Sequence, residues 1–185
     1  MGIIMKNNIL KHCSLISILI ALNGCSFTSQ IPVASTIPAD MQQLIKSTKV
    51  ESIQYNFVEN SKADLIKFRQ TSGAAIFYRE LRLNDALRPL LNELFQTKFS
   101  KISNESKNKI NIIVQDLIAN TDEPNMLALN LKIEIDKEGK RSEKSLDYSV
   151  TLGYDAREHS DVIHSFLMKF IIGIDKFLDN EFDVQ

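Results

Sequence analysis

The stretch that decides the fold is Met126–Asp136, MLALNLKIEID, where leucine or isoleucine fills every second position from Leu127 to Ile135. Most of the positions between them are polar. A second stretch, Lys144–Tyr154 (KSLDYSVTLGY), alternates in the same way. A period of two with one polar face predicts antiparallel strands that are wetted on one side. The linker 137–143 is charged and contains Gly139, so we expect the two strands to form a hairpin.

Two more strands are expected upstream of this hairpin. The segment 109–118 (KINIIVQDLI) carries apolar residues at alternate positions, and 50–57 shows a weaker alternation through Ile53, Tyr55 and Phe57. Residues 59–78 leave two alternatives open, an additional strand or an irregular loop.

Two amphipathic helices complete the predicted set. Asn84 or Asp85 can cap a helix that runs to about Phe99, with Pro89 just inside it. A second helix is expected from about 160 to about 180, with apolar residues spaced by three and four. Gly173 in its middle weakens the helix by ~1 kcal/mol relative to Ala, which indicates a close approach to the sheet.

The predicted order is β-α-β-β-β-α. Each helix has one apolar stripe and the sheet has one apolar face, so the simplest architecture is a two-layer α+β sandwich. We expect a mainly antiparallel four-stranded sheet with both helices on one face, forming a single domain over 48–185.

The first 24 residues have the pattern of a signal peptide. Lys6 and Lys11 precede the apolar run CSLISILIAL at 13–22, and no acidic residue occurs in this region. The run is about half of the ~20 apolar residues that a membrane-spanning helix needs. It ends in Leu22-Asn23-Gly24-Cys25, which predicts cleavage between Gly24 and Cys25. The alternative is an ordinary cleaved signal followed by an incidental cysteine.

This tetrapeptide resembles the lipobox of bacterial lipoproteins, in which the cysteine thiol receives a diacylglycerol and the new N-terminus an acyl chain such as palmitate. The resemblance implies that Cys25 is a lipid anchor; after cleavage no second cysteine remains to form a disulfide with it. Ser26 after the cysteine then implies the outer membrane, with the domain facing the periplasm. Residues 25–47, rich in Ser, Thr, Pro and Ala, are expected to form a flexible tether.

An anchor and tether followed by one small α+β domain is similar to the plan of small outer-membrane lipoproteins. YajG-like proteins, the LptE-like subunit of lipopolysaccharide assembly and auxiliary lipoproteins of lipid-trafficking transporters share this plan. The resemblance in the domain is architectural and rests on no motif, so no binding residue is carried over from these families.

Composition and motifs favour a non-enzymatic protein. The formal charge of -1 gives no reason to expect nucleic-acid binding. His159 and His164 are five residues apart, a spacing that places them poorly for one metal ion on a helix, although Asp155, Glu158 and Asp161 lie nearby. We find no nucleophile motif or glycine loop, and we predict no catalytic residue, no metal site and no cofactor.

One basic cluster offers an alternative function. Arg79, Arg82 and Arg88, with Arg69 nearby, surround Phe77 and Tyr78, and arginine forks suit phosphate groups. They could contact anionic lipid or lipopolysaccharide, or they could be surface residues paired with Glu80 and Asp85. The leading expectation is a lipoprotein that binds or supports an envelope assembly complex. A lipid- or lipopolysaccharide-handling accessory of a transport system is second, and an enzyme of unrecognised type is third.

Overall fold

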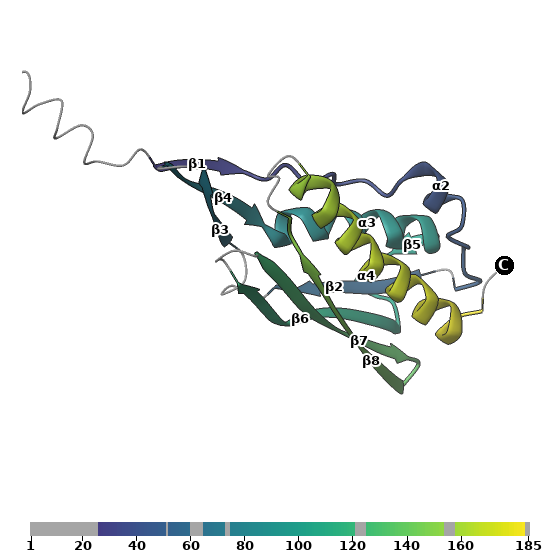
Figure 1. Ribbon diagram of the computed structural model, residues 1–185. Coiled ribbons are helices and arrows are strands. Elements are labelled where there is room, and N and C mark those ends of the chain that lie inside the picture. Colours follow the sequence, from purple (N-terminus) through teal and green to yellow (C-terminus); the bar gives the residue numbers. More distant parts are fainter. Residues whose placement is uncertain are drawn as a thin grey trace, which may run out of the picture.

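The computed structural model describes residues 26–50, 52–59, 65–72, 75–120, 125–153 and 158–183. Within them the strands form two sheets, one of five strands in the order β5-β2-β6-β7-β8 and one of three in the order β1-β4-β3 (Figure 1). The larger sheet consists of β5 (Lys101–Ile102), β2 (Ser52–Val58), β6 (Asn108–Asn120), β7 (Met126–Lys137) and β8 (Lys140–Thr151).

The hairpin predicted from the opening stretch is confirmed. Strands β7 and β8 pair antiparallel from Met126↔Thr151 to Lys137↔Lys140. The turn consists of Glu138 and Gly139, both with positive φ, a conformation that glycine adopts without strain. The Gly139 amide also donates to Asp136 Oδ1 at 2.8 Å. Every second residue of β7, from Leu127 to Ile135, is buried, as the alternation indicated.

The expectation of one mainly antiparallel four-stranded sheet is wrong, because both sheets are mixed. Strand β2 pairs parallel with β6, in a register that begins at Gln54↔Lys109, and also parallel with β5. The connection from β2 to β6 contains a helix, and such a crossover brings the chain back in the same direction. Only β6, β7 and β8 form the expected antiparallel meander.

The open question over 59–78 is answered in favour of additional strands in its described part. Strands β3 (Leu65–Ser72) and β4 (Ala75–Arg82) pair antiparallel and belong to the second sheet. Their third partner, β1 (Ser26–Gln30), pairs parallel with β4 and lies in the segment expected as a tether.

Two long helices lie on the same side of the five-stranded sheet (Figure 1). These are α3 (Leu83–Lys98) and α4 (His159–Glu181), each within a few residues of its predicted bounds. Helix α3 begins earlier than Asn84, the predicted cap, so Asn84 is a buried residue of its first turn and Pro89 lies inside the helix. In the part of the chain that the structure describes, no helix is long and apolar enough to cross a membrane.

The close approach predicted at Gly173 is also found. A Cβ atom at this position would lie 2.9 Å from Leu146 Cδ1 and 3.3 Å from the Tyr148 hydroxyl, both on β8. Tyr148 packs edge-on against Phe170 of α4, with ring centroids 4.8 Å apart. The absence of a side chain at Gly173 therefore lets α4 lie directly on the sheet.

Residues 31–50, which we call the N-terminal strap, run along the helix layer from the three-stranded sheet to β2 (Figure 1). Ile31 and Ile37 are buried, and the strap contains the short helix α2 (Ala39–Gln42). The Ile37 amide donates to Glu93 of α3 at 2.6 Å, and the Lys49 amide donates to the Asp183 carbonyl at 2.9 Å. The described part of 25–47 therefore packs against the body, whereas a flexible tether was expected, because its isoleucines find apolar surface there.

Candidate functional site

The predicted lipidation site, Gly24 and Cys25, lies outside the described residues, and its modification remains a prediction. The first described residue, Ser26, already belongs to β1 and pairs with Ile76 of β4. A lipid on Cys25 would therefore be attached one residue before a paired strand.

The three arginines that were expected to act together point in different directions. Arg79 is opposite the buried Phe68, whereas Arg82 is opposite Leu65, and three positions along a strand reverse the face. Arg82 lines a cavity of about 130 Å³ together with Glu80 and Asp85. Arg88, on α3, forms an ion pair with Glu59 and lies over the Phe57 ring, 5.5 Å from its centroid. Arg79, Arg82 and Arg88 therefore do not converge on one anion.

The three-stranded sheet instead places two arginines near one end. Thr28, Tyr78 and Arg69 form one row across β1, β4 and β3, and Ser29, Arg79 and Phe68 form the next. Successive rows face opposite sides of the sheet, so Arg69 and Arg79 lie on different faces. Arg69 is exposed and Arg79 is half-buried, and desolvation lowers the pKa of the Arg79 guanidinium.

In the next row of the sheet, an ion pair cancels the charges of its two charged residues. Lys67 Nζ lies 2.8 Å from Glu80 Oε1, in the row that includes Gln30. The part of the sheet closest to Cys25 therefore carries the positive charge of Arg69 and Arg79, and its next row adds no net charge.

The two histidines bind separate backbone carbonyls. His159 is fully buried, and its Nε2 atom lies 2.7 Å from the Gly153 carbonyl oxygen. The Nδ1 atom of His164 lies 3.0 Å from the Ala34 carbonyl oxygen of the strap. Among the residues the structure describes, no three or more His, Cys, Asp and Glu side chains are grouped so as to hold a metal ion.

The face of the five-stranded sheet opposite the helices is polar and crossed by a network. Asn56 donates to Asn111 at 3.0 Å, and Lys132 Nζ lies 3.0 Å from Glu134 and 2.8 Å from Glu143. Hydrogen bonds that the Lys132 ammonium donates to Glu143 and Glu134 raise the pKa of Lys132. The hydrogen bond from Lys132 holds the pKa of Glu134 below its usual range. Three residues of this network, Asn111, Glu134 and Glu143, border a cavity of about 480 Å³ near the hairpin turn.

An apolar groove lies between the strap and α4. Its volume is about 350 Å³, and it is lined by Met41, Leu44 and Ile45 on one side and Ile171 and Ile172 on the other. The Leu44 side chain is 75% exposed, so the groove opens to solvent. No sequence pattern had predicted this groove.

A buried lysine next to this groove also escaped prediction. Lys98 is fully buried, and its Nζ atom lies 2.6 Å from Asp175 and 2.5 Å from Asp179 of α4. It also donates to the Lys46 carbonyl of the strap at 3.2 Å. Two sequence features could have predicted its burial. Lys98 lies one turn after Leu94 on the buried stripe of α3, and two aspartates spaced four apart lie on the helix that it faces.

Comparison with known proteins shows a similarity of fold and assigns no function. No protein-family model matches the sequence, and no curated protein matches it. The crystal structure of protein XCC0632 from Xanthomonas campestris, of family DUF330, is similar with a TM-score of 0.53 and 11% identity. The similarity covers 82% of this chain and 93% of that one. An uncharacterised protein is similar with a TM-score of 0.51 and 11% identity, covering 83% of this chain and 99% of that one.

A minor lipoprotein from Acinetobacter baumannii gives a TM-score of 0.35 at 11% identity, covering 73% of this chain and 98% of that one. A TM-score this low carries no argument. The first two similarities show that the α+β fold of this chain occurs in other solved structures, and at 11% identity they show the fold alone.

Proposed function

We propose that the protein is a lipid-anchored lipoprotein of the bacterial cell envelope, held in the outer membrane by Cys25 with its domain in the periplasm. The observation that carries the proposal is Leu22-Asn23-Gly24-Cys25 at the end of a ten-residue apolar run. The run follows Lys6 and Lys11, the charge pattern of an export signal. An unpaired cysteine at this point is explained by acylation, since several acyl chains together anchor a protein stably.

The test replaces the acylated thiol. Cys25→Ser should abolish palmitate labelling and either release the protein from the membrane fraction or stall its processing. Cys13→Ser is the matched control, because Cys13 lies within the predicted signal peptide and should leave labelling and fractionation unchanged. Normal labelling of Cys25→Ser would contradict the proposal.

The domain's role in this proposal is to bind or support an envelope assembly complex, without catalysis. The polar network on the open sheet face and the groove beside α4 are two surfaces on which a protein partner could dock. Crosslinking in intact cells from a photoreactive residue at Asp147, on the open face, should give one adduct of reproducible mass. The same residue placed at Gln96, an exposed position on α3 outside the lining of the groove, reports background crosslinking. A loss-of-function envelope phenotype without any co-purifying protein would count against this role.

A second function, an accessory that handles lipid, is favoured by the apolar groove. Its volume of about 350 Å³ and its apolar lining residues suit part of an acyl chain, and the charged residues Asp175, Lys176 and Asp179 complete the lining. Leu44→Asp should then reduce the amount of lipid that co-purifies with the protein, as measured by extraction and mass spectrometry. Ile102→Asp is the control, because Ile102 is also exposed, at 41%, but lies on β5. Equal lipid content in both variants would remove the groove from consideration.

A further inference from the structure

The chain enters the domain at one end of the three-stranded sheet. Ser26 is paired with Ile76, and covalent geometry places the Cα atom of Cys25 within about 3.8 Å of that of Ser26. Figure 1 shows this sheet at one extremity of the molecule, with the start of β1 outermost. A bilayer that holds the lipid of Cys25 must therefore lie close to this end.

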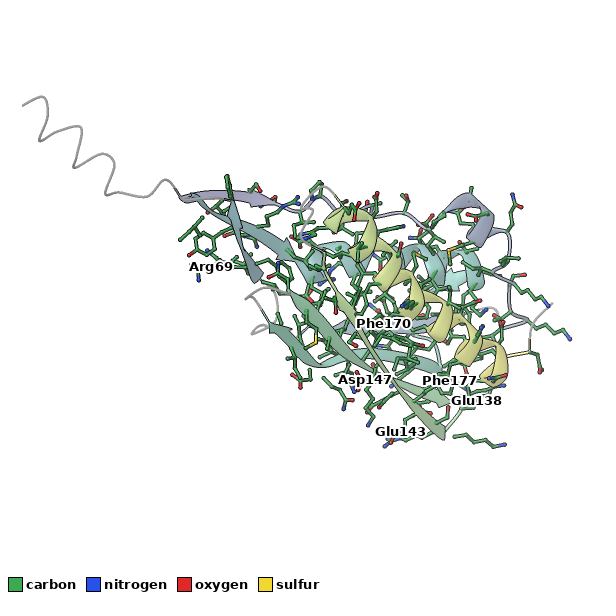
Figure 2. The ribbon with its side chains drawn as sticks, viewed as in Figure 1. Arg69, Glu138, Glu143, Asp147, Phe170 and Phe177 are labelled. Atoms are coloured by element: carbon green, nitrogen blue, oxygen red, sulfur yellow. The ribbon has the colours of Figure 1, made fainter. Side chains whose placement is uncertain are left out.

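The charge of this end is positive. Residues 26–30 and 68–79 include Arg69 and Arg79 and no acidic residue. At the opposite extremity, residues 134–144 include four basic and four acidic residues, which leave no net charge. Figure 2 shows Arg69 at one end of the molecule and Glu138 and Glu143 at the other.

The distances are short enough for this charge to act on a lipid surface. With a rise of about 3.3 Å per residue, the row of Arg69 is about 7 Å along the strands from Ser26 and the row of Arg79 is about 10 Å. The Debye length at physiological salt is about 8 Å, so along the strands the row of Arg69 lies within one Debye length of Ser26 and the row of Arg79 lies slightly beyond it. Tyr78, half-buried in the Arg69 row, is of a residue type that favours the membrane interface.

The placement of the two arginines also defines the orientation in which the sheet would approach the membrane. They lie on opposite faces near the same end, so a sheet lying flat on the membrane would turn one of them away. Only an end-on approach, with the strands pointing toward the bilayer, brings both arginines to the headgroups. The point of chain entry and the placement of the arginines thus indicate the same orientation independently.

We propose that the end of the β1-β4-β3 sheet marked by Arg69, Tyr78 and Arg79 lies end-on against the anionic phospholipid headgroups of the bilayer that holds the protein. This inference rests on the proposed lipid anchor. Each basic residue near an anionic surface strengthens binding on the order of five-fold. Arg69 and Arg79 together should therefore contribute roughly 25-fold to the apposition of the domain to the membrane.

The sequence contains no tryptophan, so an introduced tryptophan is the only one and can be excited selectively. The mature protein made from the full chain is reconstituted into vesicles of phosphatidylglycerol and brominated phosphatidylcholine. We expect strong quenching of Tyr78→Trp by the brominated lipid and little quenching of Arg141→Trp, which is exposed at the hairpin turn. Equal quenching at both positions, or stronger quenching at Arg141→Trp, overturns the proposed orientation.

Charge is tested in the Tyr78→Trp background. Arg69→Gln with Arg79→Gln should reduce quenching on phosphatidylglycerol vesicles toward the level on pure phosphatidylcholine, whereas Lys140→Gln with Arg141→Gln should not. Arg69→Gln alone, at an exposed position, keeps the test valid if the double variant unfolds. Quenching that is unaffected by either arginine change, or equally reduced by the control pair, contradicts a role for the arginines.

Acylation is measured separately, as the added mass on Cys25. Acylated protein with equal quenching of Tyr78→Trp and Arg141→Trp would refute the proposed membrane-facing surface and would leave the lipoprotein proposal unaffected. Protein without acyl groups that still co-sediments with phosphatidylglycerol vesicles, in a manner that depends on Arg69 and Arg79, would support the surface and refute the anchor. Unacylated protein that does not co-sediment would refute both.

Discussion

The buried ammonium of Lys98 joins three parts of the chain through one atom. It touches Asp175 and Asp179 of α4 and the Lys46 carbonyl of the strap. Lys98→Met would leave two neighbouring carboxylates without their cation. Losing one partner of a buried pair costs about 3–5 kcal/mol, and we expect the lower end because Asp175 and Asp179 are 16% and 31% exposed. Urea unfolding measures the difference.

Two further variants make this prediction specific. Lys176→Met removes an exposed lysine one residue after Asp175 and should change the free energy of unfolding by no more than about 0.5 kcal/mol. Combining Lys98→Met with Asp175→Leu and Asp179→Leu should recover most of the lost stability, because apolar replacements of buried ion pairs are often neutral. If Lys98→Met is as stable as Lys176→Met, the ion pairs contribute nothing.

The network on the open sheet face predicts a dependence of stability on pH. The pKa of Glu134 is lowered on folding, so its contribution is complete above its unfolded pKa of about 4.3 and is lost as the pH falls through the lower folded value. The pKa of Lys132 is raised, so its contribution holds below about 10.4 and is lost at more alkaline pH. Solvent screening keeps both contributions small.

Glu134→Gln tests the predicted loss of stability at acid pH. The variant should be less stable than the wild type at about pH 7, and the difference should shrink at an acid pH below the lowered folded pKa of Glu134, where the wild-type carboxylate is also neutral. Urea unfolding at both pH values measures it, with Glu105→Gln as the control for loss of an exposed carboxylate. A difference that is constant with pH would show that charge is not the cause.

At the scale of elements, the contact between α4 and β8 makes a prediction about Gly173. Gly173→Ala gains about 1 kcal/mol of helix propensity but places a Cβ atom 2.9 Å from Leu146. Overpacking a buried site typically costs about 1–3 kcal/mol, so we expect a net destabilisation of about 1 kcal/mol by thermal or urea unfolding.

A double-mutant cycle isolates the steric cause. In a Leu146→Ala background the space next to Gly173 is open, and Gly173→Ala should become stabilising relative to that background. The two changes together would then be less harmful than the sum of their separate effects. Additive effects would mean that Leu146 does not limit the helix at this position.

Sequence patterns predicted which elements exist more reliably than how they pair. Alternation in β7 and β8 reports which face is buried, and together with Gly139 in the linker it predicted the hairpin and its turn, whereas the close approach at Gly173 was predicted from a glycine in the middle of a helix. Alternation with one polar face favours antiparallel strands but does not identify a strand's partner, so the parallel pairing of β2 with β6 could not be obtained from it. Strand β1 was missed because SFTSQ is short and polar, and its partner β4 lies about fifty residues further along the chain.

The candidate sites show the same limit. Arg79, Arg82 and Arg88 are close in sequence, but Arg79 and Arg82 lie on opposite faces of β4 and Arg88 lies on α3, so their side chains point in different directions. Arg69, which shares an end of the sheet with Arg79, is brought there by the β3-β4 pairing. The groove beside α4 depends on the strap, whose packing was not expected.

At the scale of the whole molecule, the strap connects both sheets and both long helices. Glu93 of α3 accepts the Ile37 amide and the Gln42 side chain, and Glu93→Ala removes both acceptors. A hydrogen bond to a charged group contributes about 1.5–3 kcal/mol, so amide hydrogen exchange over 31–45 should rise roughly ten-fold or more.

Exchange in β7 should change much less, because the sheet core does not need the strap's hydrogen bonds. Glu105→Ala, at an exposed loop position, is the control and should leave 31–45 protected. An equal rise in the strap and in β7 would show that the two unfold as one unit, and an unchanged strap would show that Glu93 does not hold it.

The strap's contacts with α4 have a consequence for how the molecule is made. Ser160 donates to the Pro32 carbonyl and His164 binds the Ala34 carbonyl, residues that are 128 and 130 positions apart. A ribosome makes the strap well before α4, so the strap has no α4 surface to bind until α4 has been synthesised. A polypeptide that stops before α4 leaves Ile37 without Ile171, which lines the same groove, and this exposed segment is a target for chaperones and proteases. Packing of the strap therefore reports that α4 has been made.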